Sequence, residues 1–333
     1  MNKRVFTRRQ MIGGAATVVA APAVFAQERA LVFEHIFGET RLTRPAKRVA
    51  SLGYTSHDAL LALGITPLCV RHWYGAHPNG IWPWAQDRVG EDPPLELFGE
   101  ISAETLAALE PDLIIGLGSG ISEAEYALFS QIAPVLMHKP EFGAYATPWR
   151  EGLRMLSRAV DRVERAESVI ADVDTGFERL RHAHPDWSKN TAAVGWHFGG
   201  QTGIFSKDDS RTQFLMELGF QTAPGLADLN AIDGFYATLS PEDLSLLDTD
   251  VLLWISTWDE NPDLVDLPMR RTLAAHREGR EVFSDHVLSG ALSFNSALSI
   301  PYAIERLEPE LIAALDGTPE TIVPSSQKAG LTK

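Results

Sequence analysis

The sequence predicts an α/β protein of two lobes, each built on a mostly parallel sheet, with one long helix between them. Three observations support this class. Short apolar strands alternate with helices along both halves of the 333-residue chain. One motif occurs twice, and a long segment between the two copies keeps its apolar residues at helical spacing.

The alternation of strands and helices begins early in the chain. RVASLG from Arg48 is typical of a strand, SHDALLALG of a helix that ends at Gly64, and PLCV of the next strand. Ser102 is placed to cap a helix that Pro111 ends, and DLII follows as a fully apolar strand. Apolar strands separated by helices predict parallel sheets that are covered on both faces.

The repeated motif is SAETLAALEPDLII from Ser102, which returns as SPEDLSLLDTDVLL from Ser240. We expect one capped helix and one following strand in each lobe, although a chance match or two similar sheets would also give this likeness. Glu104 and Glu242 match in the first helical turn, where a carboxylate stabilises the positive end of a helix. Placed once on each lobe, they also suit a partner with twofold symmetry. The copies match further at Leu106 and Leu244, Leu109 and Leu247, and Asp112 and Asp250.

The segment over residues 147–184 predicts one continuous amphipathic helix. Its apolar residues recur at helical spacing, at Leu153, Leu156, Val160, Val163, Ala166, Ile170 and Val173. This helix separates an N-terminal lobe over residues 30–146 from a C-terminal lobe over residues 190–318 and a tail over residues 319–333. A continuous helix is a stiffer hinge than two or three extended strands, so we expect limited motion between the lobes.

The first 26 residues are typical of a twin-arginine export signal. They contain the pair Arg8-Arg9 and a short apolar run that ends in small residues, which predicts cleavage near Ala26. The run is shorter than the ~20 residues that a membrane anchor needs. We therefore expect a soluble, monomeric periplasmic protein.

Charge and cysteine content exclude several classes of protein. The formal charge is −15, and it becomes about −19 without the four basic residues of the signal, which argues against nucleic acid or an anionic membrane surface as a partner. Cys69 is the one cysteine, so an intramolecular disulfide and a cysteine-based zinc site are excluded. No cysteine follows the signal, and lipid attachment there is not expected.

Six segments carry a resemblance to a known family: PAKRVASLGYTSHDALLALGITPLCV, ETLAALEPDLII, SEAEYALFSQIAPV, DSRTQFLMELGF, LSPEDLSLLDTDVLL and LSIPYAIERLEPELIAAL. They resemble the substrate-binding proteins of ABC importers for iron-siderophore complexes, cobalamin and haem. The resemblance covers nearly all of the chain after the signal. It implies two Rossmann-like lobes joined by one rigid helix, with the ligand in a cleft between them. It also implies that Glu104 and Glu242 pair with arginines of an ABC permease homodimer or pseudo-dimer in the inner membrane.

Loops at the carboxyl ends of the strands should form the cleft, because ligands of open parallel sheets lie there. These loops are rich in aromatic residues, which suit a large and partly apolar ligand. A single aromatic residue alone is more typical of a core, and we expect Trp254, inside the strand VLLWI, to be buried there. The expected ligand-binding residues are Tyr54, Arg71, Trp73, Tyr74, Trp196, His197, Arg211, Trp258 and Phe294.

The charge class of the ligand stays open at this level. Ferric catecholate complexes are anionic and suit arginine, whereas neutral hydroxamates need fewer charges. Arg211 matches a position where catecholate-binding relatives place a ligand-contacting arginine, but their other arginines have no counterpart here. Phe98 and Gly120 stand about where hydroxamate binders have an arginine and a tyrosine. Arg71 or Arg150 is available to supply charge, and a solvated or helix-stabilising role fits each equally well.

We expect the protein to capture a ferric siderophore complex for delivery to an ABC permease and iron uptake, with cobalamin or haem as the second ligand class. No cofactor, metal-ligating or catalytic residues are expected. The histidines of RHWYGAH and WHF fit no common metal motif. Ser56, His57 and Asp58 are adjacent at a helix start and point in different directions, so they cannot form a catalytic triad by themselves. Direct transition-metal binding and catalysis are the less favoured classes.

Overall fold

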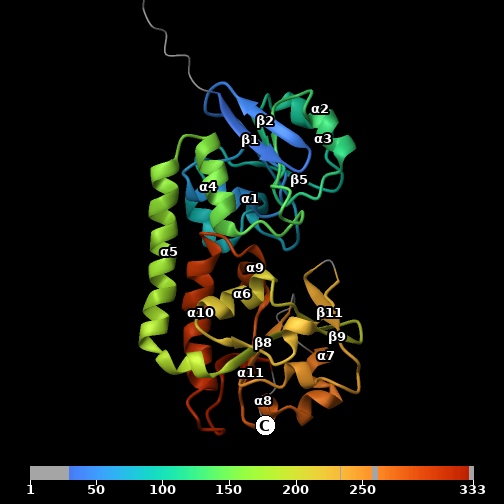
Figure 1. Cartoon of the computed structure of the whole chain (residues 1–333), viewed down its shortest axis with the longest axis vertical. Helices are drawn as coiled ribbons and strands as arrows, with labels where there is room; N and C mark the ends of the chain where they lie inside the picture. The colour runs from blue at the N-terminus through green and yellow to red at the C-terminus, as the bar shows by residue number, and fades with distance from the viewer. Residues whose placement is uncertain (1–29, 233, 257–261, 330–333) are drawn as a thin grey trace, which may run out of the picture.

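The computed structural model describes residues 30–232, 234–256 and 262–329, which form two lobes stacked beside one long helix, α5 (Val163–Ala183) (Figure 1). The expected export signal with its cleavage site near Ala26 lies outside the described residues, and so does Trp258. Within the described part of the chain, no helix is both long and apolar enough to cross a membrane. We call residues 30–160 the N-terminal lobe and residues 184–329 the C-terminal lobe.

The N-terminal lobe is built on short parallel strands. Its strands are β1 (Leu31–His35), β2 (Gly38–Leu42), β3 (Val49–Ser51), β4 (Cys69–Arg71), β5 (Leu95–Leu97), β6 (Leu113–Ile115) and β7 (Val135–Leu136). Strands β3, β6 and β7 form one parallel sheet in that order, β4 pairs with β5 in parallel, and β1 and β2 form an antiparallel hairpin. Every residue of β3 and β6 is buried, as expected for parallel strands without polar alternation.

The C-terminal lobe holds one six-stranded mixed sheet. Its strands are β8 (Thr191–Phe198), β9 (Gln201–Phe205), β10 (Gln221–Thr222), β11 (Tyr236–Thr238), β12 (Val251–Ile255) and β13 (Glu281–Phe283). Strands β8, β10, β12 and β13 are parallel, and β9 and β11 add an antiparallel edge. Trp254 in β12 is fully buried, as the sequence predicts, and its Nε1 donates to Glu281 Oε1 at 2.9 Å.

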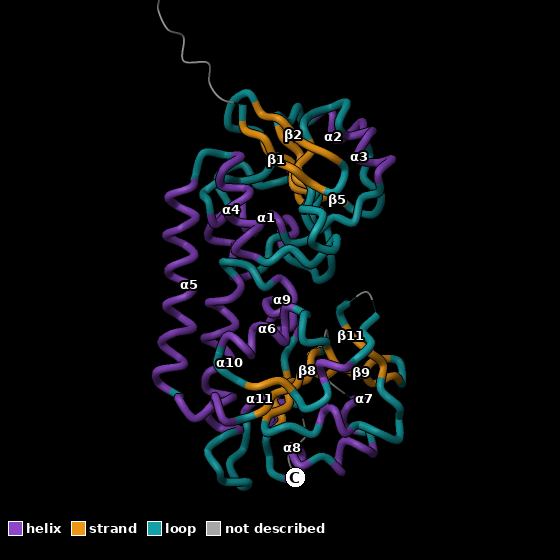
Figure 2. The backbone as a smooth tube through the Cα atoms, in the orientation of Figure 1, coloured by secondary structure: helices purple, strands orange, loops and turns teal. Residues whose placement is uncertain are grey.

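Helices cover these sheets and run along one side of the molecule. The N-terminal lobe has α1 (Ser56–Ala62), α2 (Ala103–Ala108), α3 (Glu123–Phe129) and α4 (Trp149–Ala159). The C-terminal lobe has α6 (Ser210–Glu217), α7 (Pro262–Val265), α8 (Ala274–Arg277), α9 (His286–Phe294), α10 (Ser299–Ala314) and α11 (Pro324–Lys328). Figure 2 shows α10 beside the lower half of α5, with the strands of the C-terminal lobe on the other side.

The prediction of one continuous helix over residues 147–184 was wrong, because the segment forms two helices, α4 and α5. Asp161 adopts a left-handed conformation with φ of +56°, which Asp tolerates better than most residues. The Arg162 N–H then donates to the Ser157 carbonyl at 2.8 Å, the bond that closes a Schellman cap. The buried residues of α4 belong to the core of the N-terminal lobe, while α5 contributes buried residues to both cores, through Ile170 on one side and Phe177 on the other.

The repeated motif forms a helix in only one of its two copies. In the first, the Ser102 hydroxyl caps α2 by accepting from Thr105 N–H at 3.2 Å, as predicted. The second copy forms a turn and a short 3-10 helix over Ser245–Leu247, so the expected helix there was wrong. Side chains explain the difference, because Asp243 accepts from Ser245 N–H at 3.0 Å and thereby competes with a helical backbone.

The matched aspartates of the repeat accept equivalent backbone hydrogen bonds in the two lobes. Asp112 accepts from the backbone N–H groups of Lys47 and Arg48, just before β3, and β3 pairs with the strand that follows Asp112. Asp250 accepts from Thr191 N–H at 2.8 Å, at the start of β8, and β8 pairs with the strand that follows Asp250. Each carboxylate therefore ties together the starts of two neighbouring parallel strands.

The lobes are held together by an aromatic cluster. Phe294, at the end of α9, lies 5.6 Å from Trp82 and 5.1 Å from Trp84 of the N-terminal lobe, measured between ring centroids. After α9 the chain turns at Asn295, Ala297 packs into the core of the N-terminal lobe, and α10 returns to the C-terminal lobe. The lobes are thus connected both by α5 and by this turn between α9 and α10.

A buried carboxylate adds polar bonds to the same junction. Asp58 in α1 accepts from Trp84 Nε1 at 2.8 Å and from the Ser296 hydroxyl, which comes from the other lobe. Asp58 is fully buried. These bonds satisfy one of its oxygens, whereas Oδ1 has no hydrogen-bond partner among the described residues.

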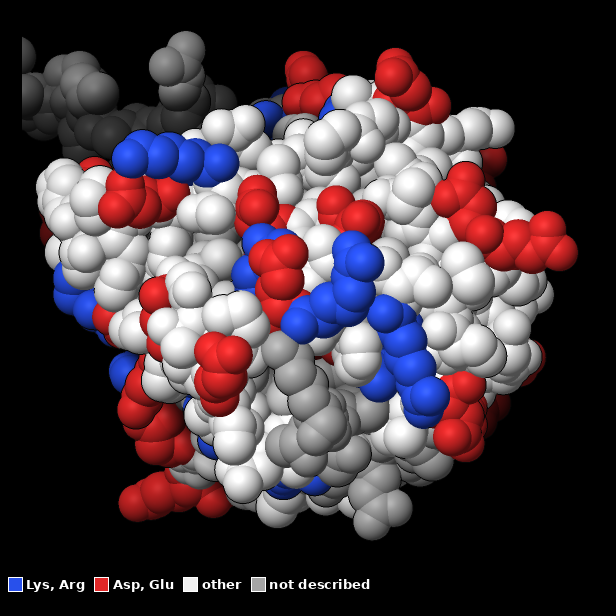
Figure 3. All heavy atoms as spheres, turned by 90° about the horizontal axis from the view of Figure 1, so that it is seen from below, with Lys and Arg blue, Asp and Glu red and all other residues white. Residues whose placement is uncertain are grey.

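The surface of the C-terminal lobe far from the junction carries both signs of charge. Figure 3 shows Lys and Arg in a short band flanked by Asp and Glu on this face. Among the coloured residues of this view, neither sign forms a broad continuous field.

Gly290→Ala is expected to destabilise the junction between the lobes. A Cβ at Gly290 would lie 2.2 Å from Trp82 Cζ3, and overpacking of this kind costs about 1–3 kcal/mol of the free energy of unfolding. Denaturant unfolding followed by circular dichroism measures the change.

Gly176→Ala in α5 is the matched control. Its new Cβ meets Ile304 Cδ1 at 3.4 Å, an ordinary contact, and Ala is favoured over Gly inside a helix by about 0.5–1 kcal/mol. Equal losses of stability in the two variants would contradict the close packing of α9 on Trp82.

Candidate functional site

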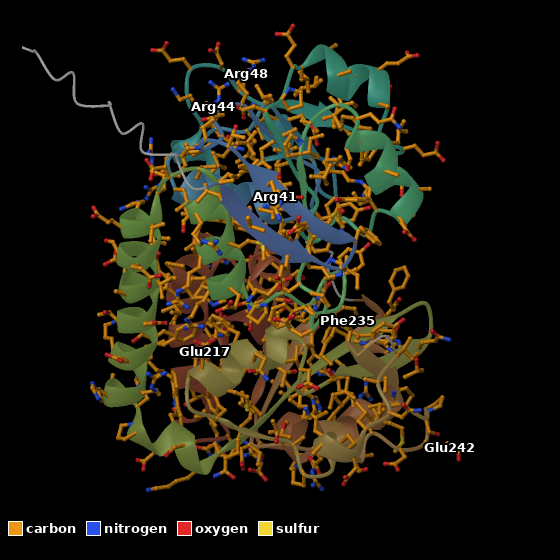
Figure 4. All side chains as sticks on the ribbon, turned by 45° about the horizontal axis from the view of Figure 1, so that its top comes forward. Arg41, Arg44, Arg48, Glu217, Phe235 and Glu242 are labelled. Carbon is orange, nitrogen blue, oxygen red and sulfur yellow. The ribbon has the colours of Figure 1, made fainter. Side chains whose placement is uncertain are left out.

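A cavity of about 1220 Å³ lies between the two lobes. Residues of both lobes line it. Its aromatic lining residues are Tyr54, Trp73, Tyr145, Trp149, Phe205, Phe235, Tyr236 and Phe294, and its charged ones are Arg71, Glu100, Glu125, Arg150, Asp208, Asp209, Arg211 and Glu217. Figure 4 labels Glu217 and Phe235, which lie where the C-terminal lobe faces the other lobe. A space of this size suits a large ligand that is mostly buried when bound.

The wall from the N-terminal lobe follows the carboxyl ends of parallel strands, as predicted. Tyr54 follows β3, Arg71 ends β4, Glu100 follows β5, and Leu117 follows β6. Because these strands run in the same direction, their ends meet at one edge of the lobe and place these residues together.

The wall from the C-terminal lobe is built differently from the prediction. It comes from Phe205 at the end of β9, Arg211 in α6 and Phe294 at the end of α9. The strand β8 does not end in a cavity loop, because Gly199 and Gly200 turn it directly into β9 with φ of +58° and +76°. Two consecutive glycines between strands are the signature of such a hairpin, and this signal was present in the sequence.

Five of the nine predicted ligand-binding residues line the cavity: Tyr54, Arg71, Trp73, Arg211 and Phe294. Tyr74 packs behind Trp73, with ring centroids 4.7 Å apart. Trp196 packs against Tyr236, which itself lines the cavity. His197 Nδ1 shares a hydrogen bond with Thr202 in the hairpin at 2.8 Å. Neither Trp196 nor His197 is among the residues that line the cavity. Trp258 lies outside the described residues.

Arg71 is the cavity arginine with the fewest partners. Its Nη1 donates to the Ser119 carbonyl at 3.0 Å, and its guanidinium stacks 4.5 Å from the centre of the Tyr54 ring. No carboxylate in the described part of the chain lies within ion-pair distance of it. Most of its N–H donors are therefore available to a ligand.

Arg211 is neutralised by its own helix cap. Its Nη1 lies 2.9 Å from Asp209 Oδ2, its Nη2 donates to Ser293 Oγ at 2.8 Å, and it stacks 4.3 Å from the Phe205 ring centre. Its buried Nε has no partner among the described residues. Arg211 thus offers a directional donor but little net charge.

Arg150 connects both lobes and the long helix. From α4 it donates to Glu217 of α6 at 3.0 Å through Nη1 and to Asp174 of α5 at 3.0 Å through Nε. Burial disfavours its charged form, but the hydrogen bonds and charges of Glu217 and Asp174 outweigh burial and raise its pKa. Two carboxylates hold this one guanidinium, so it is not a free cation.

Several lining residues were missed by the sequence reading, among them Tyr145, Thr147 and Trp149. A Cβ at Gly120 would lie 2.0 Å from Tyr145 Oη, so Tyr145 occupies the space that a side chain at Gly120 would fill. Thr147 Oγ1 and Trp149 Nε1 are buried polar atoms without a partner among the described residues, and both residues line the cavity. Only the tertiary structure shows these positions, because the segment ending at Trp149 has no motif of its own.

Ser56, His57 and Asp58 form no catalytic triad in the structure. The Ser56 hydroxyl bonds to Ser51 Oγ at 2.7 Å, and neither ring nitrogen of His57 has a hydrogen-bond partner among the described residues. His57 Nε2 is 3.8 Å from Asp58 Oδ1. Burial lowers the pKa of His57 to about 4 and raises the pKa of Asp58 to about 7. Both are structural parts of the junction under the cavity.

The described residues contain no group of three or more His, Cys, Asp and Glu side chains placed to hold a metal ion. His72, one of the histidines near the cavity, shares a hydrogen bond with Glu96 Oε1 at 2.7 Å and stacks on the exposed ring of Phe98. The cavity offers aromatic surface, charged side chains and directional donors.

A family model described as periplasmic binding protein matches residues 49–280. The chain belongs to the periplasmic binding protein family. The matched range includes β3 to α8 and therefore most residues of both cavity walls, but it ends before Phe294 and its neighbours in and after α9. The family is one of binding proteins, and its two-lobed α/β architecture is the predicted fold class.

Relatives of this periplasmic binding protein come from several bacteria. The probable siderophore-binding lipoprotein YfiY of Bacillus subtilis is 29% identical over 219 residues, which is 65% of each protein, so the match spans less than two thirds of that relative. A periplasmic solute binding protein of Mycobacterium smegmatis is 32% identical with a TM-score of 0.76, covering 86% of this chain and 99% of that one. PiaA of Streptococcus pneumoniae in complex with ferrichrome is 23% identical with a TM-score of 0.71, covering 86% and 99%, and supports the fold alone.

Asp58→Asn is expected to change how stability depends on pH. The folded protein keeps a proton on Asp58 up to a pKa of about 7, whereas the unfolded chain releases it near the ordinary value of 3.8. The contribution of Asp58 to stability is therefore greatest below pH 3.8 and is lost as pH rises towards 7. Asn mimics the protonated form, so the stability of the variant relative to wild type should rise by on the order of 4 kcal/mol between about pH 4 and about pH 8.

Denaturant unfolding of both proteins across this pH range measures the difference. His57 is present in both proteins, so its own titration largely cancels. A constant difference at every pH would show that Asp58 is already ionised in the folded protein.

Proposed function

We propose that this chain is exported by its twin-arginine signal, captures a ferric siderophore complex in the cavity between its lobes, and delivers it to an inner-membrane ABC permease for iron uptake. The observation that carries the proposal is the cavity itself. Its walls come from two lobes, it is large, and aromatic side chains line it together with charged side chains, most of which are paired within the protein. Such a lining suits an iron chelate with an apolar periphery.

The comparisons support a siderophore as the ligand class. YfiY is described as a probable siderophore-binding lipoprotein, and the PiaA structure contains ferrichrome. These descriptions concern those proteins, and we extend the general class to this chain because the matched region includes most residues of both cavity walls.

We propose Tyr54, Arg71, Trp73, Arg211 and Phe294 as ligand contacts, since all five line the cavity. Thr147 Oγ1 and Trp149 Nε1 join them, because a buried donor without a partner is costly unless a ligand or water satisfies it. The ligand would thus meet aromatic rings from both lobes and a small set of donors around its polar centre.

Glu104 and Glu242 are proposed as permease-docking residues. Both side chains are exposed, one on each lobe. Figure 4 shows Glu242 at the edge of the C-terminal lobe away from α5, and Figure 1 shows α2, which carries Glu104, on the same side of the molecule. Glu242 lies in a turn rather than a helix, so the two carboxylates share position and exposure but not local structure.

We propose that lobe motion during binding is small. The chain crosses between the lobes through α5 and through the turn between α9 and α10, and Asp58 and Ser296 bond across the junction. An opening rotation would have to break this buried contact.

Titration with ferric siderophores should quench tryptophan fluorescence saturably and without turnover. The panel contains ferric hydroxamate, catecholate and carboxylate siderophores together with cobinamide and haemin. Trp73→Ala should weaken binding about tenfold, because it removes an aromatic wall. Trp187→Phe, in the core of the C-terminal lobe, is the matched control and should leave affinity unchanged. A response to a macrocycle alone would favour cobalamin or haem, and silence across the panel would contradict an importer function.

Glu104→Ala combined with Glu242→Ala should lower transport more than about tenfold while ligand affinity stays within about twofold, because docking charges act on the permease rather than on the ligand. Uptake into proteoliposomes containing the permease measures transport. Glu34→Ala combined with Glu320→Ala removes two exposed carboxylates elsewhere and serves as the control. A loss of ligand affinity in the first pair would show that these glutamates are not docking residues.

A further inference from the structure

The charged groups of the cavity do not form a positive field. Three guanidiniums and five carboxylates line it: Arg71, Arg150 and Arg211, with Glu100, Glu125, Asp208, Asp209 and Glu217. Their partners decide what charge a ligand would meet.

Two of the three guanidiniums are compensated inside the protein. Arg150 contacts both Asp174 and Glu217, so this cluster has one negative charge in excess. Arg211 and Asp209 cancel each other, with Nη1 and Oδ2 2.9 Å apart. Arg71 alone has no ion-pair partner in the described part of the chain, and it supplies one positive charge.

The other carboxylates offset that charge at the cavity edge. Glu125 accepts from Ser122 N–H at 2.7 Å, and this bond, the Ser122 hydroxyl and the charge of Arg71 hold its pKa below the ordinary value, so it is ionised. Glu100 is exposed and has no ion pair within the described residues. Asp208 is balanced by Lys207 Nζ at 2.7 Å. The cavity with its immediate partners is thus negative overall.

The charge of a ferric siderophore follows from its chelating groups. Three doubly deprotonated catecholates on Fe(III) give a trianion, whereas three singly deprotonated hydroxamates give a neutral complex, or a cation when an ammonium is attached. A trianion loses its hydration in the cleft and needs several uncompensated cations in return. Arg71 provides one.

We infer that this cleft accepts ferric complexes of zero or positive charge, the charge class of the tris-hydroxamates, and rejects trianionic tris-catecholates. The inference rests on the proposed siderophore function and adds the chemical class of the ligand. Aromatic rings from both lobes supply the main contact surface, and Arg71 supplies one directional cation for the oxygen atoms around the iron.

The test compares three complexes by tryptophan quenching: ferrioxamine B, which is cationic, its N-acetylated form, which is neutral with the same iron centre, and ferric enterobactin, which is trianionic. Cobinamide and haemin are titrated alongside them. We expect both hydroxamates to bind and the catecholate to bind at least about 100-fold more weakly at about 50 mM salt. High salt should narrow the gap, because it screens the repulsion. Catecholate binding within about tenfold of the hydroxamates would overturn the inference and leave the siderophore function standing. Binding of cobinamide or haemin alone would overturn the proposed function and the inference with it.

A charge variant separates repulsion from shape. Glu100→Gln, Glu125→Gln and Asp208→Asn together should strengthen catecholate binding at least about tenfold and leave the neutral hydroxamate within about twofold. The matched control removes three exposed acids away from the cavity, through Glu34→Gln, Asp92→Asn and Glu305→Gln, and should change neither affinity. Catecholate binding that stays weak in the cavity variant would show that shape rejects the ligand, which overturns the charge inference.

Discussion

The rest of the structure depends on the buried junction where Phe294 meets Trp82 and Trp84 and where Ser296 bonds to Asp58. The two cavity walls belong to different lobes, so the cavity has a defined shape only while this junction holds. Aromatic packing fixes the separation of the lobes, because interiors are close-packed and resist small displacements. Gly290 is part of the same constraint, since α9 can approach Trp82 only where no Cβ intervenes.

A second contact between the lobes, made by Arg150, explains how charge is distributed around the cavity. Arg150 comes from α4 and finds its partners on α5 and α6, so one side chain ties together the N-terminal lobe, the long helix and the C-terminal lobe. A partly buried guanidinium needs such partners, because an unpaired charge there would be costly. The same carboxylates that satisfy Arg150 remove its charge from the cavity. Its structural use is therefore incompatible with a second use as an anion-binding cation.

One aromatic loop shows the limits of prediction from sequence. RHWYGAHPNGIWPW was expected to form a cavity wall. Trp73 does line the cavity, but Trp82 and Trp84 pack at the junction, and Tyr74 supports Trp73 from behind. Composition identifies such a loop as an interface of some kind. It does not say which ring faces the ligand, because that depends on where α9 of the other lobe docks.

The sequence by itself determined the alternation of strands and helices, the carboxyl-end location of the N-terminal wall, the Ser102 cap and the burial of Trp254, because each follows from local periodicity or capping chemistry. The tertiary structure decided the rest. The break at Asp161, the loss of the helix at Glu242 and the choice of Arg71 as the unpaired arginine depend on contacts and local bonds that no regular pattern records. The sequence alone does not distinguish the three cavity arginines, Arg71, Arg150 and Arg211. They differ in function because the fold brings carboxylates to two of them and leaves the third without one.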